Sequence, residues 1–195
     1  FCDDMARAVA DSGTKNNISR SIANPMGADV SRLESFDEMK HFYREFNDAA
    51  DGRIIVDMSL HAEYTSNPET AVALADYARS LDGVKMQVHV SETEFEHSEC
   101  IKRHGMTPAA YLEKTGIFDV PAVAAHCVYS DDSDLEIFKR KGVTVAANPV
   151  SNMKLASGIC NVQKIIDKGV NLAIGTDSVA SNNSLNFFEE IKTLV

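Results

Sequence analysis

The stretch with the clearest chemical content is residues 88–93, an apolar run that ends in His89 and is followed three residues later by Glu92. Residues 84–90 are rich in Val and Met and follow a helix-like segment, which is typical of a buried parallel strand. Parallel α/β folds keep ligand-binding residues where such strands open into loops. We therefore interpret His89 and Glu92 as a candidate catalytic pair, although a buried core histidine followed by an ordinary loop glutamate would leave the same pattern.

Polar side chains end nearly every other predicted strand as well. They are Arg20, His61, His126, Asn148 and Asp177. If the strands are parallel, all these ends lie on one rim, and groups that are distant in sequence converge there. Imidazoles and a carboxylate on one rim suit a divalent metal of the zinc or iron type, while a second carboxylate remains free for acid/base work. The metal would lower the pKa of a bound water to around 7.

The elements that must position these groups alternate between strand and helix along the whole chain. Strands are predicted at residues 17–20, 53–60, 84–90, 122–127, 143–147 and 170–174, and helices at 3–11, 35–49, 66–81, from 94, 107–114, 131–141, 159–168 and from 185. Strict alternation predicts an α/β fold with a parallel sheet, whose commonest closed form is the (β/α)8 TIM barrel. Six units make about three quarters of such a barrel. We expect a single domain over residues 1–195, incomplete as a barrel, in a chain that resembles a fragment.

Helix ends carry their own local signals. Ser66 and Glu69 have the spacing of a capping box at the start of the 66–81 helix. Asp131 and Asp134 stand at the start of the 131–141 helix and three basic residues stand at its end, so the charges complement the helix dipole.

Composition excludes several classes of partner. The chain has 44% hydrophobic and 25% charged residues and a formal net charge of -10, which argues against nucleic acid or an anionic membrane as a partner. No stretch approaches the roughly 18 apolar residues of a membrane span, and no signal-peptide core is present at the N-terminus. The four cysteines lack CxxC spacing, so we expect reduced thiols and a cytoplasmic location.

Six motifs along the chain belong together. They are Leu60-His61-Ala62, His89-Val90-Ser91-Glu92-Thr93, Ala125-His126-Cys127-Val128, Asn148-Pro149-Val150-Ser151-Asn152-Met153-Lys154-Leu155-Ala156-Ser157-Gly158, Gly175-Thr176-Asp177 and Ala180-Ser181-Asn182-Asn183. In order and spacing the chain resembles the metal-dependent amidohydrolase superfamily. Within it, the chain is similar to the branch that includes methylthioadenosine/S-adenosylhomocysteine deaminase, with guanine deaminase and chlorotriazine hydrolases as relatives.

The resemblance implies a role for each matching residue. His89 would bind one divalent metal ion, zinc or alternatively iron. Asp177 would be a second ligand that also takes a proton from the metal-bound water. Glu92 would contact the substrate and hand a proton to its ring nitrogen, while His126 would hold the attacking hydroxide and the tetrahedral intermediate. The implied reaction is hydrolytic deamination of an adenine-type nucleoside, with release of ammonia.

Three further residues match substrate-binding positions. His61 would contact the ribose or the purine. Arg20 and Arg32 would meet the distal part of the substrate, and the carboxylate of a homocysteine tail is a natural bidentate partner for an arginine.

The chain departs from the family pattern at several points. No two histidines are two residues apart, so the His-x-His pair that would supply two further metal ligands is absent from these 195 residues, as is an upstream glutamate that would read the purine. Glu63 stands where Pro is expected, and Ser178 follows Asp177 where Gly is usual. We therefore expect this polypeptide alone to be inactive and to bind metal weakly.

Other functions fit part of the pattern. The substrate could be guanine, a chlorotriazine or another cyclic amidine, and the chain could be a non-catalytic barrel fragment. Against the second alternative, a binding scaffold has no need to keep a proton shuttle together with a metal base. An incomplete barrel also has an open sheet edge that invites pairing with another chain, so homo-oligomerisation is a further expectation.

Overall fold

The computed structural model describes residues 1–194 and contains one parallel sheet. Its six strands pair in sequence order and are β1 (Asn16–Ile22), β2 (Ile54–Leu60), β3 (Met86–Val90), β4 (Ala122–His126), β5 (Thr144–Ala147) and β6 (Asn171–Ile174). Every neighbouring pair is parallel. Since parallel neighbours require a crossover connection, each strand is followed by helical structure before the next begins. The predicted α/β class and the six units are confirmed.

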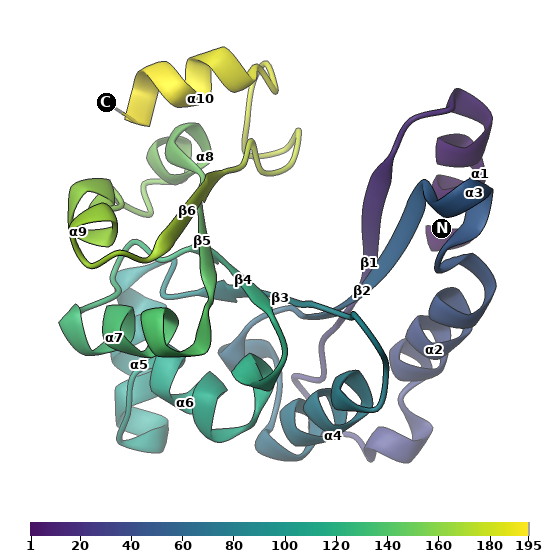
Figure 1. Ribbon diagram of the computed structural model, residues 1–195. Coiled ribbons are helices and arrows are strands. Elements are labelled where there is room, and N and C mark those ends of the chain that lie inside the picture. Colours follow the sequence, from purple (N-terminus) through teal and green to yellow (C-terminus); the bar gives the residue numbers. More distant parts are fainter. Residues whose placement is uncertain (195) are drawn as a thin grey trace.

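Helices connect the strands. They are α1 (Cys2–Ser12), α2 (Glu34–Phe46), α3 (Ala49–Gly52), α4 (Pro68–Arg79), α5 (Glu94–His104), α6 (Pro108–Lys114), α7 (Asp132–Lys141), α8 (Pro149–Lys154), α9 (Val162–Asp167) and α10 (Phe187–Leu194), with short 3-10 helices η1 (Val30–Arg32), η2 (Glu63–Thr65) and η3 (Ile117–Asp119). Figure 1 shows the sheet as a curved wall with α2, α4, α5, α6, α7 and α9 along its convex side. Helices α8 and α10 lie together beyond β5 and β6, and the sheet ends at β1 and β6 are separated by an open gap.

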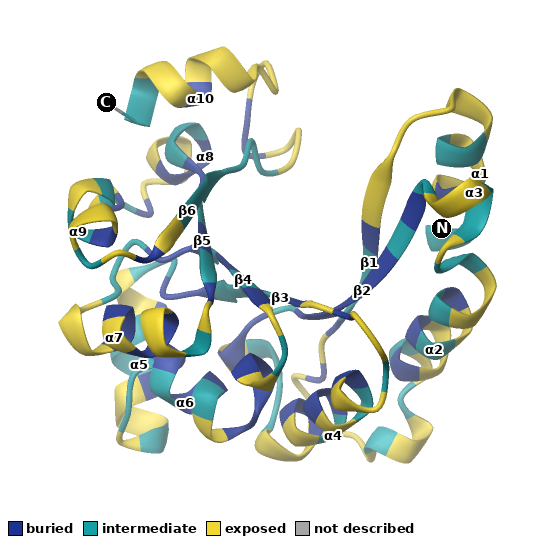
Figure 2. Cartoon of the chain, viewed as in Figure 1, coloured by how far each residue is buried: buried dark blue, intermediate teal, exposed yellow. Residues whose placement is uncertain are grey.

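Alternation along each strand separates the core from the concave face. In β2, Val56, Met58 and Leu60 are fully buried against the helices. Asp57 and Ser59 lie between them in sequence, so their side chains point to the opposite face. Figure 2 shows the same division in the helices, whose buried residues face the sheet. The main apolar cluster therefore fills the space between the sheet and its helices, and polar groups such as Asp57 and Ser59 lie on the concave face.

Two helix starts show how local chemistry sets boundaries. The capping box predicted at Ser66 is wrong: Asn67 is the capping residue of α4, and its side chain accepts a hydrogen bond from the amide of Thr70. The reason is Pro68, which favours the first helical position and holds the residue before it in an extended conformation. At α7, the acidic start expected from the dipole is present, and Asp131 and Asp134 also form a reciprocal capping box, which was not predicted.

Candidate active site

Three histidines lie side by side at the carboxyl ends of β2, β3 and β4. The ring centroids of His61 and His89 are 4.9 Å apart. Those of His89 and His126 are 5.3 Å apart, with the rings inclined by 24°. Register explains the second contact, because Val90 pairs with His126 across the β3–β4 ladder. The structure therefore brings together three of the residues singled out in the sequence.

His89 is oriented by the strand beside it. Its Nδ1 is 2.6 Å from the carbonyl oxygen of His61, and a carbonyl oxygen can only accept, so Nδ1 carries the proton. The lone pair of Nε2 is then free. A histidine that donates one ring N–H to a backbone carbonyl and keeps the other nitrogen free has the usual form of a metal ligand. Burial and the neighbouring His89 lower the pKa of His61, so that imidazole is neutral near pH 7.

His126 faces Glu92 across the end of the sheet. Its Nε2 is 3.6 Å from Oε2 of Glu92, and 2% of the His126 side chain is exposed. Regular alternation would point His126 toward the helices, as it does for Ala124. A left-handed backbone, with φ = 72° at His126 and 51° at Cys127, redirects the side chain toward His89. Such conformations cost about 1–3 kcal/mol each and cluster at functional sites.

Asp177 occupies a similar left-handed position, with φ = 59°, just after β6. Its carboxylate accepts hydrogen bonds from the hydroxyl of Ser151 at 2.6 Å and from the amide of Ser178 at 2.7 Å. Burial raises the pKa of Asp177, but the hydrogen bonds from Ser151, Ser178 and Ser181 and the nearby His126 outweigh it and lower the pKa below its usual value. Asp177 is therefore ionised at neutral pH and can accept a proton or bind a cation.

A buried carboxylate holds the backbone that carries Glu92. Glu96, in the first turn of α5, accepts from the amide of Ser91 at 2.9 Å and from the amide of Glu92 at 2.7 Å. Its side chain is 3% exposed, and burial raises its pKa to about 7, although those two backbone hydrogen bonds act in the opposite direction. Sequence reasoning assigned no role to Glu96, and only its place in the first turn of a helix that follows the motif could have indicated one.

Sequence reasoning also left three residues of the 148–158 motif without a role. Ser151 donates to Asp177, Asn152 accepts from Nδ1 of His126 at 2.9 Å, and Ser157 donates to Glu92 at 3.3 Å. Their motif was recognised, but the six-residue helix α8 that presents the first two was not predicted. Its signal was Pro149, which is well suited to the first position of a helix.

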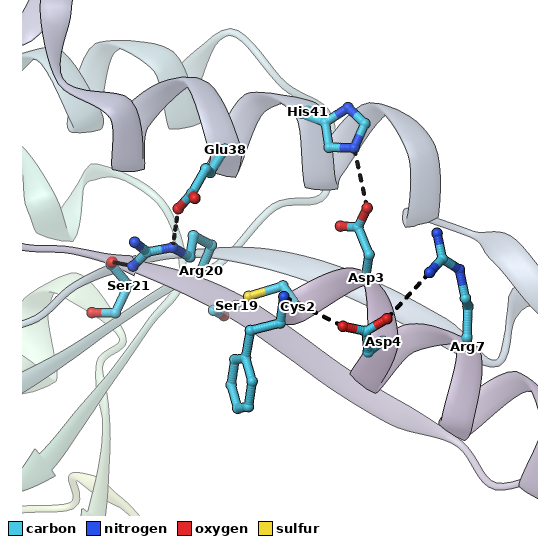
Figure 3. A pocket seen from close by; sticks show the side chains of 10 residues that line it. Cys2, Asp3, Asp4, Arg7, Ser19, Arg20, Ser21, Glu38 and His41 are labelled. Carbon is cyan, nitrogen blue, oxygen red and sulfur yellow. Dashed lines mark hydrogen bonds and ion pairs between the residues drawn. The ribbon is translucent and has the colours of Figure 1, made fainter.

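The two arginines lie elsewhere. Arg20 is on the helix-facing side of β1, between the buried Ile18 and Ile22, and its Nε donates to Glu38 of α2 at 2.7 Å. Arg20 lines a cavity of about 680 Å³ between α1, β1 and α2. Figure 3 shows its guanidinium directed toward Glu38. Arg32 is exposed at the end of η1. The structure does not bring either guanidinium to the group formed by His61, His89 and His126.

Glu63 has a structural explanation. The side chain, 2% exposed, accepts two hydrogen bonds from the guanidinium of Arg103 and one from Nε2 of His104 at 2.8 Å. Both partners stand at the end of α5. Glu63 therefore fixes η2, the segment directly after His61, against the helix that begins beside Glu92.

Comparison with known proteins identifies the family. Residues 3–195 match the Amidohydrolase family. The chain belongs to the amidohydrolase family. It is 43% identical over 191 residues to the 5-methylthioadenosine/S-adenosylhomocysteine deaminase of Caldanaerobacter subterraneus subsp. tengcongensis, and 42% identical over 194 residues to the 5'-deoxyadenosine deaminase of Methanopyrus kandleri; in each case the match covers 98% of this chain and 44% of the relative.

Solved structures confirm the barrel type. A zinc-bound adenosine deaminase from Xanthomonas campestris superposes with a TM-score of 0.87 at 30% identity, covering 99% of this chain and 44% of that one. Guanine deaminase from C. acetobutylicum gives a TM-score of 0.86 at 20% identity, over 99% of this chain and 48% of that one, and so shows the fold alone. The six-stranded sheet is therefore part of an amidohydrolase barrel, and the chain spans less than half the length of these relatives.

The donor set fits part of an amidohydrolase metal site. His89 offers a free Nε2 and Asp177 an ionised carboxylate. Within residues 1–194, no group of three or more His, Cys, Asp or Glu side chains lies close enough to hold an ion. Catalytic zinc sites use three protein ligands and a water. These two residues could therefore complete a site but do not form one between them.

The first prediction concerns metal affinity. We expect the isolated 195-residue chain to lose zinc on dialysis, because two protein ligands are too few for tight binding. Zinc content after dialysis, measured by atomic emission, checks this, with the zinc-bound Xanthomonas campestris adenosine deaminase treated in parallel as a control. One tightly held zinc per chain would contradict the prediction.

The second prediction uses the raised pKa of Glu96. Because the folded-state pKa, about 7, lies above the ordinary 4.5, the stability linked to this group is fully present below pH 4.5 and is lost as the pH rises through about 7. At 1.36 kcal/mol per pKa unit this amounts to roughly 3 kcal/mol. Glu96→Gln cannot titrate, so its unfolding free energy should depend less on pH between 5 and 8.

Urea unfolding at several pH values measures this difference in the longest natural form of the protein. Glu94→Gln, an exposed neighbour on the same helix, serves as the matched control and should keep the wild-type pH dependence. An identical pH dependence in Glu96→Gln and wild type would show that Glu96 does not titrate in this range.

Proposed function

We propose that the longest natural form of this amidohydrolase deaminates an adenine-type nucleoside of the S-adenosylhomocysteine or methylthioadenosine class and releases ammonia. The observation that carries the proposal is the arrangement of Glu92, His126 and Asp177, in which a carboxylate faces a buried imidazole at 3.6 Å and a second carboxylate is held ionised by hydroxyl and amide donors. Relatives 38–43% identical to this chain are named as deaminases of such nucleosides, which supports the choice of substrate.

The proposed roles follow from protonation state and position. A bound metal would supply a water that is acidic near neutral pH. Asp177, ionised in the folded protein, accepts a proton from the attacking water. The free Nε2 of His126 accepts a hydrogen bond from the same water and holds it over the ring. Glu92 then protonates the ring nitrogen, so that C6 becomes a better electrophile.

Atoms and protons balance in this scheme. The proton from Glu92 stays on the ring nitrogen, the water oxygen forms a bond to C6, and Asp177 passes the proton that it took from the water to the amino group. The bond between C6 and the amino nitrogen then breaks and ammonia leaves, while the second proton of the water oxygen returns to Glu92 as the carbonyl forms. His61, which is neutral and adjacent to His89, contacts the nucleoside in this proposal. Its Nδ1 lies 2.9 Å from the hydroxyl of Thr65, which fixes the orientation of the ring.

Zinc is the metal that we propose, with iron as the alternative. Imidazole and carboxylate ligands suit both ions, and the adenosine deaminase from Xanthomonas campestris contains zinc. Residues 1–194 include no helix with the length and apolar character needed to cross a membrane. All four cysteines are free thiols, which fits the reducing cytoplasm that we propose as the location.

The third prediction is the reaction itself. With zinc and S-adenosylhomocysteine, we expect the adenine absorbance band to convert to that of hypoxanthine. Glu92→Gln should lower kcat by about 10²–10⁴-fold, because the amide cannot donate the proton that the ring nitrogen needs. The rate of the ultraviolet change measures both effects.

The matched control is Glu94→Gln, which removes an exposed carboxylate two residues away. It should leave kcat unchanged. If the zinc-loaded protein leaves the adenine band unchanged, the substrate assignment fails, and guanine and triazine rings are the next substrates to test.

The fourth prediction concerns Arg20 and Arg32, which we retain as candidate contacts to an anionic tail. For this contact Arg20 must exchange Glu38 for the substrate carboxylate. Arg20→Ala should then raise KM for S-adenosylhomocysteine by about 10- to 100-fold, as expected for the loss of a hydrogen bond between charged groups. KM for methylthioadenosine, which lacks the carboxylate, should not change.

Steady-state kinetics with both substrates decide the point, with Arg32→Ala measured in the same way and exposed Arg44→Ala on α2 as the control. Unchanged KM for S-adenosylhomocysteine in Arg20→Ala and Arg32→Ala would remove both arginines from the substrate site.

A further inference from the structure

We propose that Asn152 is a positioning residue that fixes His126 in the tautomer protonated on Nδ1, so that the lone pair of Nε2 faces Glu92 and the reacting atoms. The effect on turnover rests on the proposed function. The tautomer itself does not, because it is a property of the folded protein without substrate.

The hydrogen bond between the two side chains defines the tautomer. Nδ1 of His126 is 2.9 Å from Oδ1 of Asn152. An amide oxygen can only accept, so the ring nitrogen must donate. His126 is 2% exposed and Asn152 is 1% exposed, so bulk water has no access to replace either partner. On the other side of the ring, Nε2 is left as an acceptor, 3.6 Å from Oε2 of Glu92.

Backbone hydrogen bonds hold Asn152 in place, so its side chain is free to bind Nδ1 of His126. Its amide donates to the carbonyl of Asn148 at 2.9 Å, and its carbonyl accepts from the amide of Ser157 at 2.8 Å. Within the described residues, Nδ2 of Asn152 is buried and has no hydrogen-bond partner. A side chain selected for stability alone would not bury an unpaired amide group, which costs about 1–3 kcal/mol. The contact with His126 gives a reason for that cost.

The neighbours of Asn152 act on the other two catalytic candidates. Ser151 donates to Asp177 and Ser157 donates to Glu92. A single segment, residues 151–157, therefore contacts three side chains from three different strand ends. Glu190 of α10 anchors the start of this segment: its buried carboxylate accepts from the amide of Val150 at 3.1 Å and also pairs with Asn182. The segment is thus a rigid support for the site.

The fifth prediction concerns the tautomer of His126. Histidine ¹⁵N NMR on the longest natural form of the protein, without substrate, tests it first. We expect wild-type His126 to be protonated on Nδ1. Asn152→Leu removes the acceptor and should shift the proton to Nε2. Asn152→Asp keeps an acceptor oxygen at the same place and should keep the wild-type tautomer. Asn171→Leu, which alters an exposed amide at the other end of β6, is the matched control.

Kinetics of the zinc-loaded protein provide the second readout. Asn152→Leu should lower kcat by about 10- to 100-fold, the usual loss when the hydrogen-bond partner of a histidine at a metal site is removed, with KM and zinc content unchanged. Asn152→Asp should restore part of that loss.

The proposal is overturned if wild-type His126 is protonated on Nε2, or if Asn152→Asp loses the Nδ1 proton. It is also overturned if Asn152→Leu shifts the tautomer and kcat does not fall. The wild-type and Asn152→Asp spectra decide the assignment even if Asn152→Leu does not fold. If the protein turns over no adenine nucleoside while His126 is protonated on Nδ1, the proposed function fails and the positioning role of Asn152 stands.

Discussion

The carbonyl oxygen of His61 accepts two hydrogen bonds from one residue, His89: one from its backbone amide at 3.1 Å and one from Nδ1 at 2.6 Å. The first continues the parallel ladder between β2 and β3 beyond the last residue of β2. The second locks the imidazole to that ladder. A backbone group of the sheet thus sets both the position and the tautomer of the candidate metal ligand, and any change in strand register would move the ligand with it. The neighbouring site residues His61 and His126 lie on either side of His89.

The loops after the strands need other contacts to hold their backbone in place. Glu92 and Asp177 lie beyond the strands, where no ladder fixes the backbone. The structure uses buried acceptors and donors instead: the carboxylate of Glu96 binds the two amides before and at Glu92, and Ser151 and Ser178 bind the two oxygens of Asp177. A buried carboxylate that binds two backbone amides restrains a loop more tightly than packing alone, because its desolvation is compensated only in that geometry.

Strands and the polar residues at their carboxyl ends could be predicted from the sequence. Apolar runs located all six strands. The polar residues at or just beyond the carboxyl ends of these strands include His61, His89, His126 and Asp177, and parallel strands bring those ends together. Periodicity could not predict the direction of His126, which is set by two left-handed residues. Alternation does place Arg20 on the same face of β1 as Ile18 and Ile22, toward α2, whereas the expected substrate contact of Arg20 came from the family resemblance alone. The short helix α8 was also missed, since six residues are too few to show a helical period.

Local signals in the sequence, such as those for helix starts, were limited by competition between neighbouring residues and by tertiary contacts. A capping box and a single capping asparagine compete for the same start of α4, and Pro68 decides between them by restricting the residue before it. Glu63 is similar. In the sequence Glu63 is only a departure from the family pattern. It is buried beside Arg103 and His104, about forty residues away in sequence, and local sequence rules cannot predict such a tertiary contact.

His89 and His126 share one tautomer, although we propose different roles for them. Both rings direct Nδ1 to an oxygen acceptor and leave Nε2 free. The acceptors differ. His89 donates to a backbone carbonyl that the sheet holds in a fixed position, which suits a metal ligand that must keep a fixed bond direction. His126 is bound to a side-chain amide on a separate helix, and it faces a carboxylate, which suits a group that exchanges hydrogen bonds with the reacting atoms as charge develops. In the proposed mechanism, the metal ligand His89 and the catalytic imidazole His126 therefore differ in the group that binds Nδ1 of each ring.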